Sequence, residues 1–272
     1  HICLCSGMWL YIGIGASKQF FGTVNGKLLY LIQEATALDD SMTFFYRAAA
    51  LAGIATQFAW GGLRILAFQA FYRADPSAFP MGLEALSSYI WLQQALLALL
   101  NSWFFDGELL EMITSGNVSY ELCRPVNLYD SWLAKTMSIR VSRVLLRCLP
   151  ILLFAAFLPK PYGLSAPASV SLGLLAALST ILGFLVLVTF SMLIYIAAFY
   201  TTSSAGVRII AVNIVEFFSG SLLPLSFFPD WMQGFLRIQP FASIQDTPFM
   251  IYGGSFSQRE ALLSLLLQLL WA

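Results

Sequence analysis

The sequence has little charge. Charged residues make up only 10% of its 272 residues, whereas 59% are hydrophobic and 15% are aromatic. Soluble domains usually carry about a quarter charged residues. The 14 basic and 14 acidic side chains cancel, so a net positive charge that would attract nucleic acid is lacking. We therefore expect an integral membrane protein that has no nucleic-acid partner.

Residues for catalysis and metal binding are scarce as well. The chain has one histidine, His1, and four scattered cysteines, at positions 3, 5, 123 and 148. These do not make a zinc site or a disulfide scaffold. The motifs GxxxxGK[ST], GxSxG and HExxH are missing, and no histidine is placed to activate a serine or a cysteine. We expect a chain that is not an enzyme and binds no cofactor and no metal.

Long hydrophobic runs are what the sequence does have. Five runs are long enough to cross a bilayer, which takes about 20 residues, and a sixth is cut short. They cover about residues 48–72, 83–105, 139–158, 168–199, 207–228 and 260 to the end. In the fourth run a stripe of small residues that includes Ala176 and Gly183 favours close helix packing. The expected fold is all-α: a polytopic membrane protein with six transmembrane helices, a cytoplasmic coupling loop and outer amphipathic helices.

The loop charges predict the orientation of these helices, because short cytoplasmic loops are rich in Lys and Arg. One side of the predicted topology carries Lys18, Lys27, Arg47, Arg124, Lys135, Arg140, Arg143, Arg147 and Arg208, and the other carries Arg73, Lys160, Arg237 and Arg259. The first side is expected to be cytoplasmic. The spacing of Arg140, Arg143 and Arg147 predicts one shared helix face, which favours anchoring to anionic headgroups for at least two of the three, with contact to a soluble partner as the alternative.

The two ends of the sequence do not resemble complete transmembrane segments. The apolar stretch from Ile2 to Ala16 is shorter than a span and has no basic region before it. We expect residues 1–26 to be an unassigned leader, partial or non-native. The last helix stops within an apolar run at Trp271, so we expect it to be truncated.

Among the polar residues of the predicted spans, Arg64, Asn213 and Glu216 are the candidates for a transport path or an intramembrane pair. Arg64 falls in the outer half of the first span, and Glu216 falls near the middle of the fifth, one turn after Asn213. A charged group inside a bilayer costs at least ~2.5 kcal/mol and usually faces a cavity or a partner. We consider three interpretations: a structural pair of Arg64 with Glu216 or separate snorkelling of each charge to the interface, a transport path, and a misplaced span.

The longest polar stretch between hydrophobic runs, GELLEMITSGNVSYELCRP from Gly107 to Pro125, resembles a known family. The residues Ile113, Gly116, Val118, Leu122, Arg124 and Pro125 are similar to the cytoplasmic loop after the second span in one branch of the ABC-2 transporter permeases. A second similarity, to the outer loop before the last span, is carried by Ser219, Gly220, Pro224, Pro229, Pro240, Phe241, Pro248 and Gly254. The resemblance covers residues 27–272, a single permease domain.

The resemblance implies a permease that pairs with a second copy or with a homologous permease in a cell membrane, the prokaryotic cytoplasmic membrane being expected. Two separate P-loop ATPase subunits would bind and hydrolyse ATP and drive export. The ATPase would dock on the loop between the second and third spans. In that loop Gly116 is expected to permit a tight turn, Glu121 and Arg124 to offer charges, and Pro125 to begin a new segment.

Two other function classes stay open. A secondary transporter could use Glu216 as its ion-coupling carboxylate, but such proteins usually have two related halves with paired broken helices, and the sequence has no internal repeat. A membrane enzyme acting on lipids would need a cluster of titratable residues, which the sequence lacks. The transported substrate is not readable, because one scaffold can serve many cargoes.

Overall fold

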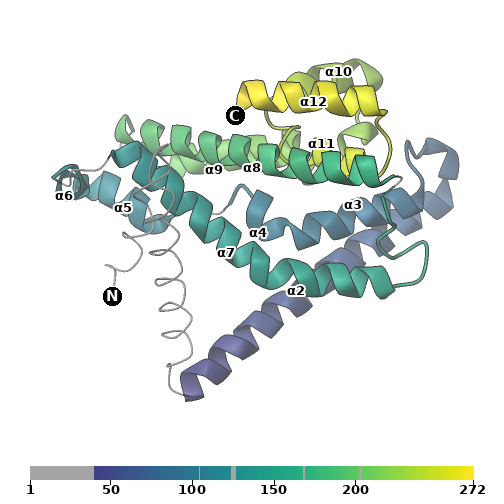
Figure 1. Ribbon diagram of the computed structural model, residues 1–272, viewed down its shortest axis with the longest axis horizontal. Coiled ribbons are helices and arrows are strands. Elements are labelled where there is room, and N and C mark those ends of the chain that lie inside the picture. The colour runs from purple at the N-terminus through teal and green to yellow at the C-terminus, as the bar shows by residue number, and fades with distance from the viewer. Residues whose placement is uncertain (1–39, 104, 124–126, 168, 202–203) are drawn as a thin grey trace.

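The computed structural model describes residues 40–103, 105–123, 127–167, 169–201 and 204–272. Every regular element in these ranges is a helix, which confirms the predicted all-α class. The predicted leader, residues 1–26, lies outside the described residues, as do Arg124 and Pro125. Figure 1 shows α2, α3, α7, α8 and α9 along the length of the molecule, with α5 and α6 at one end.

The first half of the chain forms the long helices α2 (Asp40–Ala74) and α7 (Leu128–Phe157) with shorter helices between them. The short 3-10 helix η1 (Pro76–Ala78) leads to α3 (Leu83–Ala95), which is followed at once by α4 (Leu97–Leu100). Asn101 is extended and ends α4. The polar segment then forms α5 (Gly107–Ser115) and α6 (Val118–Leu122). The second predicted run, 83–105, is therefore a broken helix.

The second half begins with α8 (Val170–Phe199), the most apolar helix, which is capped by the Ser169 hydroxyl. Helix α9 (Ser204–Phe218) follows and is only 15 residues long. After the 3-10 helix η2 (Leu225–Phe227), the chain forms α10 (Asp230–Ile238), α11 (Asp246–Tyr252) and α12 (Gln258–Trp271). One continuous helix over 207–228 is a wrong prediction, because the chain turns at Gly220, whose φ is 81°.

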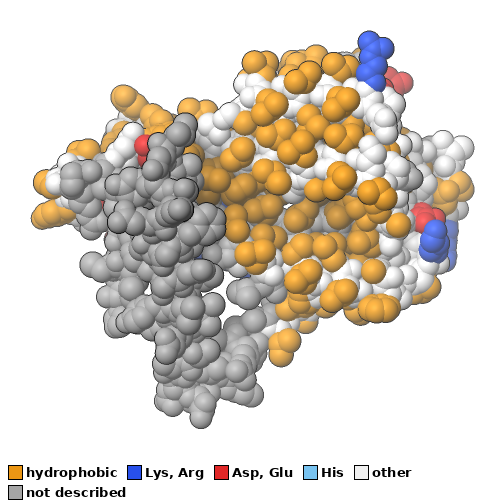
Figure 2. Space-filling view, in the orientation of Figure 1, with side chains coloured by type: hydrophobic (Ala, Val, Ile, Leu, Met, Phe, Trp, Pro, Cys, Tyr) orange, Lys and Arg blue, Asp and Glu red, His pale blue; other side chains and the backbone are white. Residues whose placement is uncertain are grey.

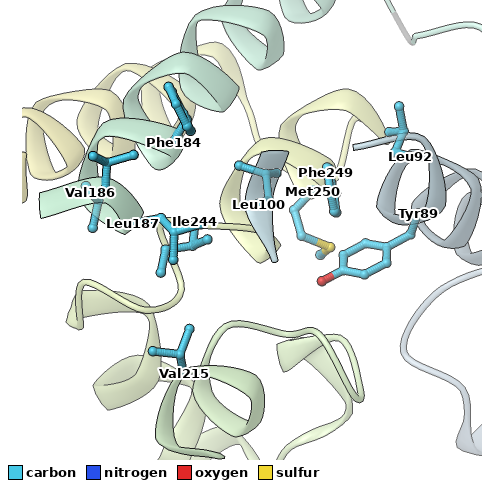
Figure 3. Close-up of a cluster of buried hydrophobic side chains, with 11 residues drawn as sticks. Tyr89, Leu92, Leu100, Phe184, Val186, Leu187, Val215, Ile244, Phe249 and Met250 are labelled. Carbon is cyan, nitrogen blue, oxygen red and sulfur yellow. The ribbon is translucent and has the colours of Figure 1, made fainter. Parts of the chain in front are cut away.

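Helix α8 is the centre of the packing and contacts α4, α5, α7, α9, α11 and α12. Its residues Phe184 and Leu187 lie in a core that also includes Tyr89 from α3, Val215 from α9 and Met250 from α11 (Figure 3). A Cβ at Gly183 would lie 2.4 Å from the Ser243 carbonyl oxygen. The small residue therefore lets the backbone before α11 approach α8 closely, as the stripe of small residues predicted.

Among the residues that the structure describes, two helices are long and apolar enough to cross a bilayer on their own: α2 over Leu51–Ala74 and α8 over Val170–Phe199. The other predicted spans are broken, shorter or more polar in the structure. Figure 2 shows apolar side chains over the middle of one face, while the few charged side chains visible lie near its edges. A membrane protein is consistent with this distribution, and six full spans stay a prediction.

Candidate functional site

The turn that follows α9, which ends at Phe218, is held by polar side chains from other helices. Glu216 lies in the last turn of α9 rather than near the middle of a span. Buried Tyr89 of α3 donates to the Gly220 carbonyl over 3.0 Å, and Gln93 of α3 donates to the Ser221 carbonyl over 2.7 Å. At membrane depth such irregular backbone is tolerated only where protein satisfies its polar groups. These side chains therefore make the break in the helix possible.

Arg64 of α2 is the positive charge at this helix end. Its guanidinium donates to the Ser221 carbonyl over 2.7 Å and to the Leu222 carbonyl over 3.1 Å, and it also contacts the amide oxygen of Gln93. Ser221 and Leu222 lie three and four residues beyond the last residue of α9, so Arg64 binds the turn that follows the helix rather than the carbonyl groups of its last turn.

Glu216 is held by two serines. One of its oxygens accepts a hydrogen bond from Ser102 over 2.5 Å, and the other accepts one from Ser221 over 2.6 Å. Of the described residues, Arg64 and Glu216 form no direct ion pair; Ser221 connects them through its carbonyl and its hydroxyl. Asn213 takes no part, because it is exposed and its side chain donates back to the Ile209 carbonyl over 2.7 Å.

A second helix end, that of α4, is satisfied in the same way. Arg140 of α7 is only 1% exposed and donates to the Asn101 carbonyl over 2.6 Å and to the Leu99 carbonyl over 3.3 Å. Gln245 donates to the carbonyl between them, Leu100, over 3.1 Å, and accepts from Gln93 over 3.1 Å. The two helix ends are therefore joined by one buried polar network.

The basic face predicted for α7 is divided in the structure. Arg140 is buried against the end of α4, so the headgroup anchoring expected for at least two of the three arginines stays a prediction for Arg143 and Arg147. The Arg147 guanidinium lies near Gly53 of α2, where an added Cβ would be 3.4 Å away. Arg143 is exposed. The three arginines follow one another about one helical turn apart on α7, but their guanidinium groups have different surroundings.

The polar segment after α4, residues 107–123, is packed on α7 and α8, and we name it the docking segment after the ATPase contact that the sequence predicts for it. Leu109, Leu110 and Ile113 of α5 are buried against Trp132 of α7 and Tyr195 of α8. Gly116 ends α5 with a φ of 78°, which confirms the tight turn predicted there. On α6, Tyr120 is 76% exposed and Leu122 is 65% exposed, so the outer surface carries large apolar side chains. Glu121 lies between them on α6.

Ion pairs fix the start of the docking segment to α7. Lys135 lies 2.6 Å from the Asp106 carboxylate and 3.1 Å from the Glu108 carboxylate. Burial lowers the pKa of Lys135, but these two carboxylates outweigh burial, and the pKa is raised above its ordinary value. Asp106 also caps α5 by accepting from the Glu108 amide over 3.0 Å, and its own amide donates to Tyr195. These contacts hold the start of α5 against α7 and α8.

We compared the sequence of the chain with models of known protein families. The model of the ABC-2 family transporter protein matches residues 58–272. The chain belongs to the ABC-2 transporter family. No curated protein and no solved structure matched the chain significantly. As an ABC-2 transporter the chain is a membrane transport protein, and the resemblance found in the docking segment and in the 219–254 region is confirmed.

The sequence analysis singled out three of the charges of the network, Arg64, Glu216 and Arg140, but missed most of their partners. Tyr89, Gln93, Ser102, Ser221 and Gln245 all belong to it. A signal was present: two consecutive glutamines at 93 and 94 interrupt an apolar run, and both are 4% exposed. Buried polar side chains must be hydrogen-bonded, so such residues in a hydrophobic run indicate a partner in another segment.

Proposed function

We propose that this ABC-2 transporter chain is the permease subunit of an ATP-driven exporter. It crosses the membrane six times, pairs with a second copy or a homologous permease, and binds a separate P-loop ATPase. The chain itself hydrolyses no ATP. The family match supports a transport permease, and the exposed apolar surface of the docking segment is the observation that carries the ATPase partnership.

The ATPase docks on α6 and on the exposed face of α5. Tyr120 and Leu122 supply the apolar area that a stable contact needs, and Glu121, with Arg124 beyond the described residues, supplies charge for orientation. Movement of the ATPase then reaches the membrane helices through Lys135 and the buried leucines of α5. The docking segment moves together with α7 and α8, because the ion pairs of Lys135 and the buried leucines of α5 hold it to both helices.

The buried network has a structural part in this function. Arg64 and Glu216 fix the end of α9 relative to α2 and α3, so they hold the shape of the permease rather than exchange protons. Both oxygens of Glu216 are bonded by serine hydroxyls, which favours a fixed carboxylate. The contacts thus support the structural interpretation over ion coupling through Glu216.

Site-specific photo-crosslinking tests the docking surface. A photoreactive phenylalanine analogue replaces Tyr120 in the full chain, expressed in its source cells, and crosslinked proteins are identified by mass spectrometry. We expect a protein with a P-loop motif. The matched control places the same analogue at Trp231, which is 81% exposed on α10 and predicted to lie on the other side of the membrane. Crosslinking of the ATPase from position 231, or from neither position, would contradict the proposal.

A further inference from the structure

Helix α9 presents a row of exposed residues on the side that faces away from the core. Gly206, Ile210, Asn213 and Phe217 follow one another at steps of four, three and four residues, so they share one face of the helix. Ile210 is 64% exposed and Phe217 is 44% exposed, and Gly206 and Asn213 are exposed as well. The opposite face is buried in the core through Val215. We call the four exposed residues the α9 seam.

Asn213 is the polar member of the α9 seam. It lies six residues inside the predicted fifth span, 207–228, where no water is present to bind a polar side chain. Its amide nitrogen donates to the Ile209 carbonyl of the same helix over 2.7 Å, and among the described residues its amide oxygen has no partner. An amide nitrogen carries two hydrogens, so one donor is left as well. Asn213 therefore offers one donor and one acceptor to a partner outside the described chain.

Helix α9 is also short and packed on one side for a helix of a membrane protein. Its 15 residues rise about 22 Å, less than the ~30 Å of the hydrocarbon core. In the described part of the chain it packs mainly against α8. Oligomerisation is one of the ways in which a bilayer accommodates a short helix. The steps of three and four residues along the seam are those of two helices that pack side by side.

We propose that the α9 seam is the surface at which two copies of this chain pack against each other. The inference rests on the proposed pairing of the permease and names the surface that this pairing uses. Two copies inserted in the same orientation are related by a two-fold axis along the membrane normal. Their α9 helices therefore run parallel, and each residue of the seam faces its equivalent at the same depth.

The amide of Asn213 favours a second copy over lipid as the occupant of the seam. Lipid tails have no donor and no acceptor, so they would leave the free groups of Asn213 unsatisfied. A second Asn213 satisfies both, because an amide donates and accepts. The seam carries no charge that would repel its copy, and Ile210 and Phe217 supply apolar contact. A single asparagine on an apolar seam also fixes the register of two paired helices.

Cysteine crosslinking tests the contact. The four native cysteines of the full chain are replaced by serine, Asn213→Cys is introduced, and membranes from the expressing cells are treated with copper phenanthroline. We expect a disulfide-linked dimer on a non-reducing gel. The matched control is Leu145→Cys, because Leu145 is 68% exposed on α7 and also lies six residues inside its predicted span, 139–158. The control should stay monomeric on the gel.

A second measurement keeps the native cysteines. The fraction of dimer in mild detergent is followed by light scattering as the protein is diluted, which gives an apparent Kd. We expect Asn213→Leu to raise this Kd roughly three- to twentyfold, the range for an interhelical hydrogen bond in a membrane. Asn213→Gln keeps a donor and an acceptor and should raise it less. Ser142→Leu, a change from polar to leucine at an exposed position of α7, should leave the Kd unchanged.

The outcomes separate this inference from the proposed pairing. A dimer that forms without crosslinking at position 213, or an unchanged Kd for Asn213→Leu, would overturn the α9 seam and leave the pairing intact. Labelling of Asn213→Cys by a water-soluble maleimide without any crosslinking would also overturn the seam, in favour of a water-filled path beside α9. A chain that is monomeric in both membranes and detergent would overturn the pairing of like copies together with the seam.

Discussion

Helices end by different means in the interior and on the docking segment. The end of α4 and the turn after α9 lie among packed helices, and the carbonyl groups there bind Arg140, Arg64, Gln93 and Gln245. The end of α5 lies at the surface, where Gly116 turns the chain and needs no side chain from another helix. Water can satisfy carbonyls at the surface but not at membrane depth, so an interior helix end requires donors from the protein. Substitutions at the two kinds of helix end should therefore reduce the stability of the protein by different amounts.

The largest effect is expected at Arg140. Arg140→Gln leaves the Leu99 and Asn101 carbonyls without their charged donor in a site that is 1% exposed. We expect a loss of about 2–4 kcal/mol of stability, because both the hydrogen bonds and the solvation of the carbonyls are lost. Thermal unfolding of the purified chain measures it. Arg143→Gln, one turn away and exposed, is the control and should change stability by no more than ~0.5 kcal/mol.

Arg64 should matter less than Arg140. It also binds two carbonyl groups, those of Ser221 and Leu222, but it is only half-buried, and Gln93 shares one of them. We expect Arg64→Gln to cost about 1–3 kcal/mol in the same unfolding measurement. If Arg64→Gln removed more stability than Arg140→Gln, the burial of the arginine would not be what decides the size of the loss.

A smaller loss is expected at the surface helix end. Gly116 has a φ of 78°, and a Cβ there would meet open space. Gly116→Ala should therefore cost about 1 kcal/mol through backbone strain alone. Gly107→Ala is the control, because a Cβ at position 107 also meets open space and its φ is not positive. Equal stability of the two variants would mean that the turn after α5 does not depend on glycine.

The smallest effect is expected at Glu216. Glu216→Gln keeps the size of the side chain, and the amide can still accept from one serine and donate to the other. We expect a loss of less than about 1 kcal/mol and no change in the response of transport to the proton gradient. Uptake or export of a confirmed substrate, with and without an uncoupler at constant ATP, checks this. Loss of gradient-driven transport in the variant would favour a secondary transporter.

The sequence predicted the helical class, the family and the turn at Gly116, because each depends on local pattern: long apolar runs, spaced motif residues, and a glycine after a helix. Apolar length alone did not predict the breaks at Asn101 and Gly220, since a hydrophobic run looks the same whether its helix continues or turns. What distinguishes them is the set of donors from α2, α3 and α7, which are far away in sequence.

The candidate site was predicted only in part for the same reason. Arg64 and Glu216 were found because charges are rare in apolar runs, but their connection through Ser221 depends on the turn after α9. The spacing of Arg140 and Arg143 correctly predicted that both lie on one face of α7. It could not predict that the end of α4 covers Arg140 and leaves Arg143 exposed. In the docking segment the turn at Gly116 was predicted correctly, since the motif is continuous in the sequence, and the contact with an ATPase stays a prediction.

The central claim is that this ABC-2 transporter works through a separate ATPase bound to α6. The most direct measurement is ATP hydrolysis by three purified samples: the chain alone, the chain with the ATPase identified by crosslinking, and the chain with the double substitution Tyr120→Ala and Leu122→Ser mixed with the same ATPase. We predict no hydrolysis by the chain alone, co-purification and altered ATPase activity in the second sample, and loss of both in the third. Hydrolysis by the chain alone, or an unchanged complex with the double substitution, would contradict the claim.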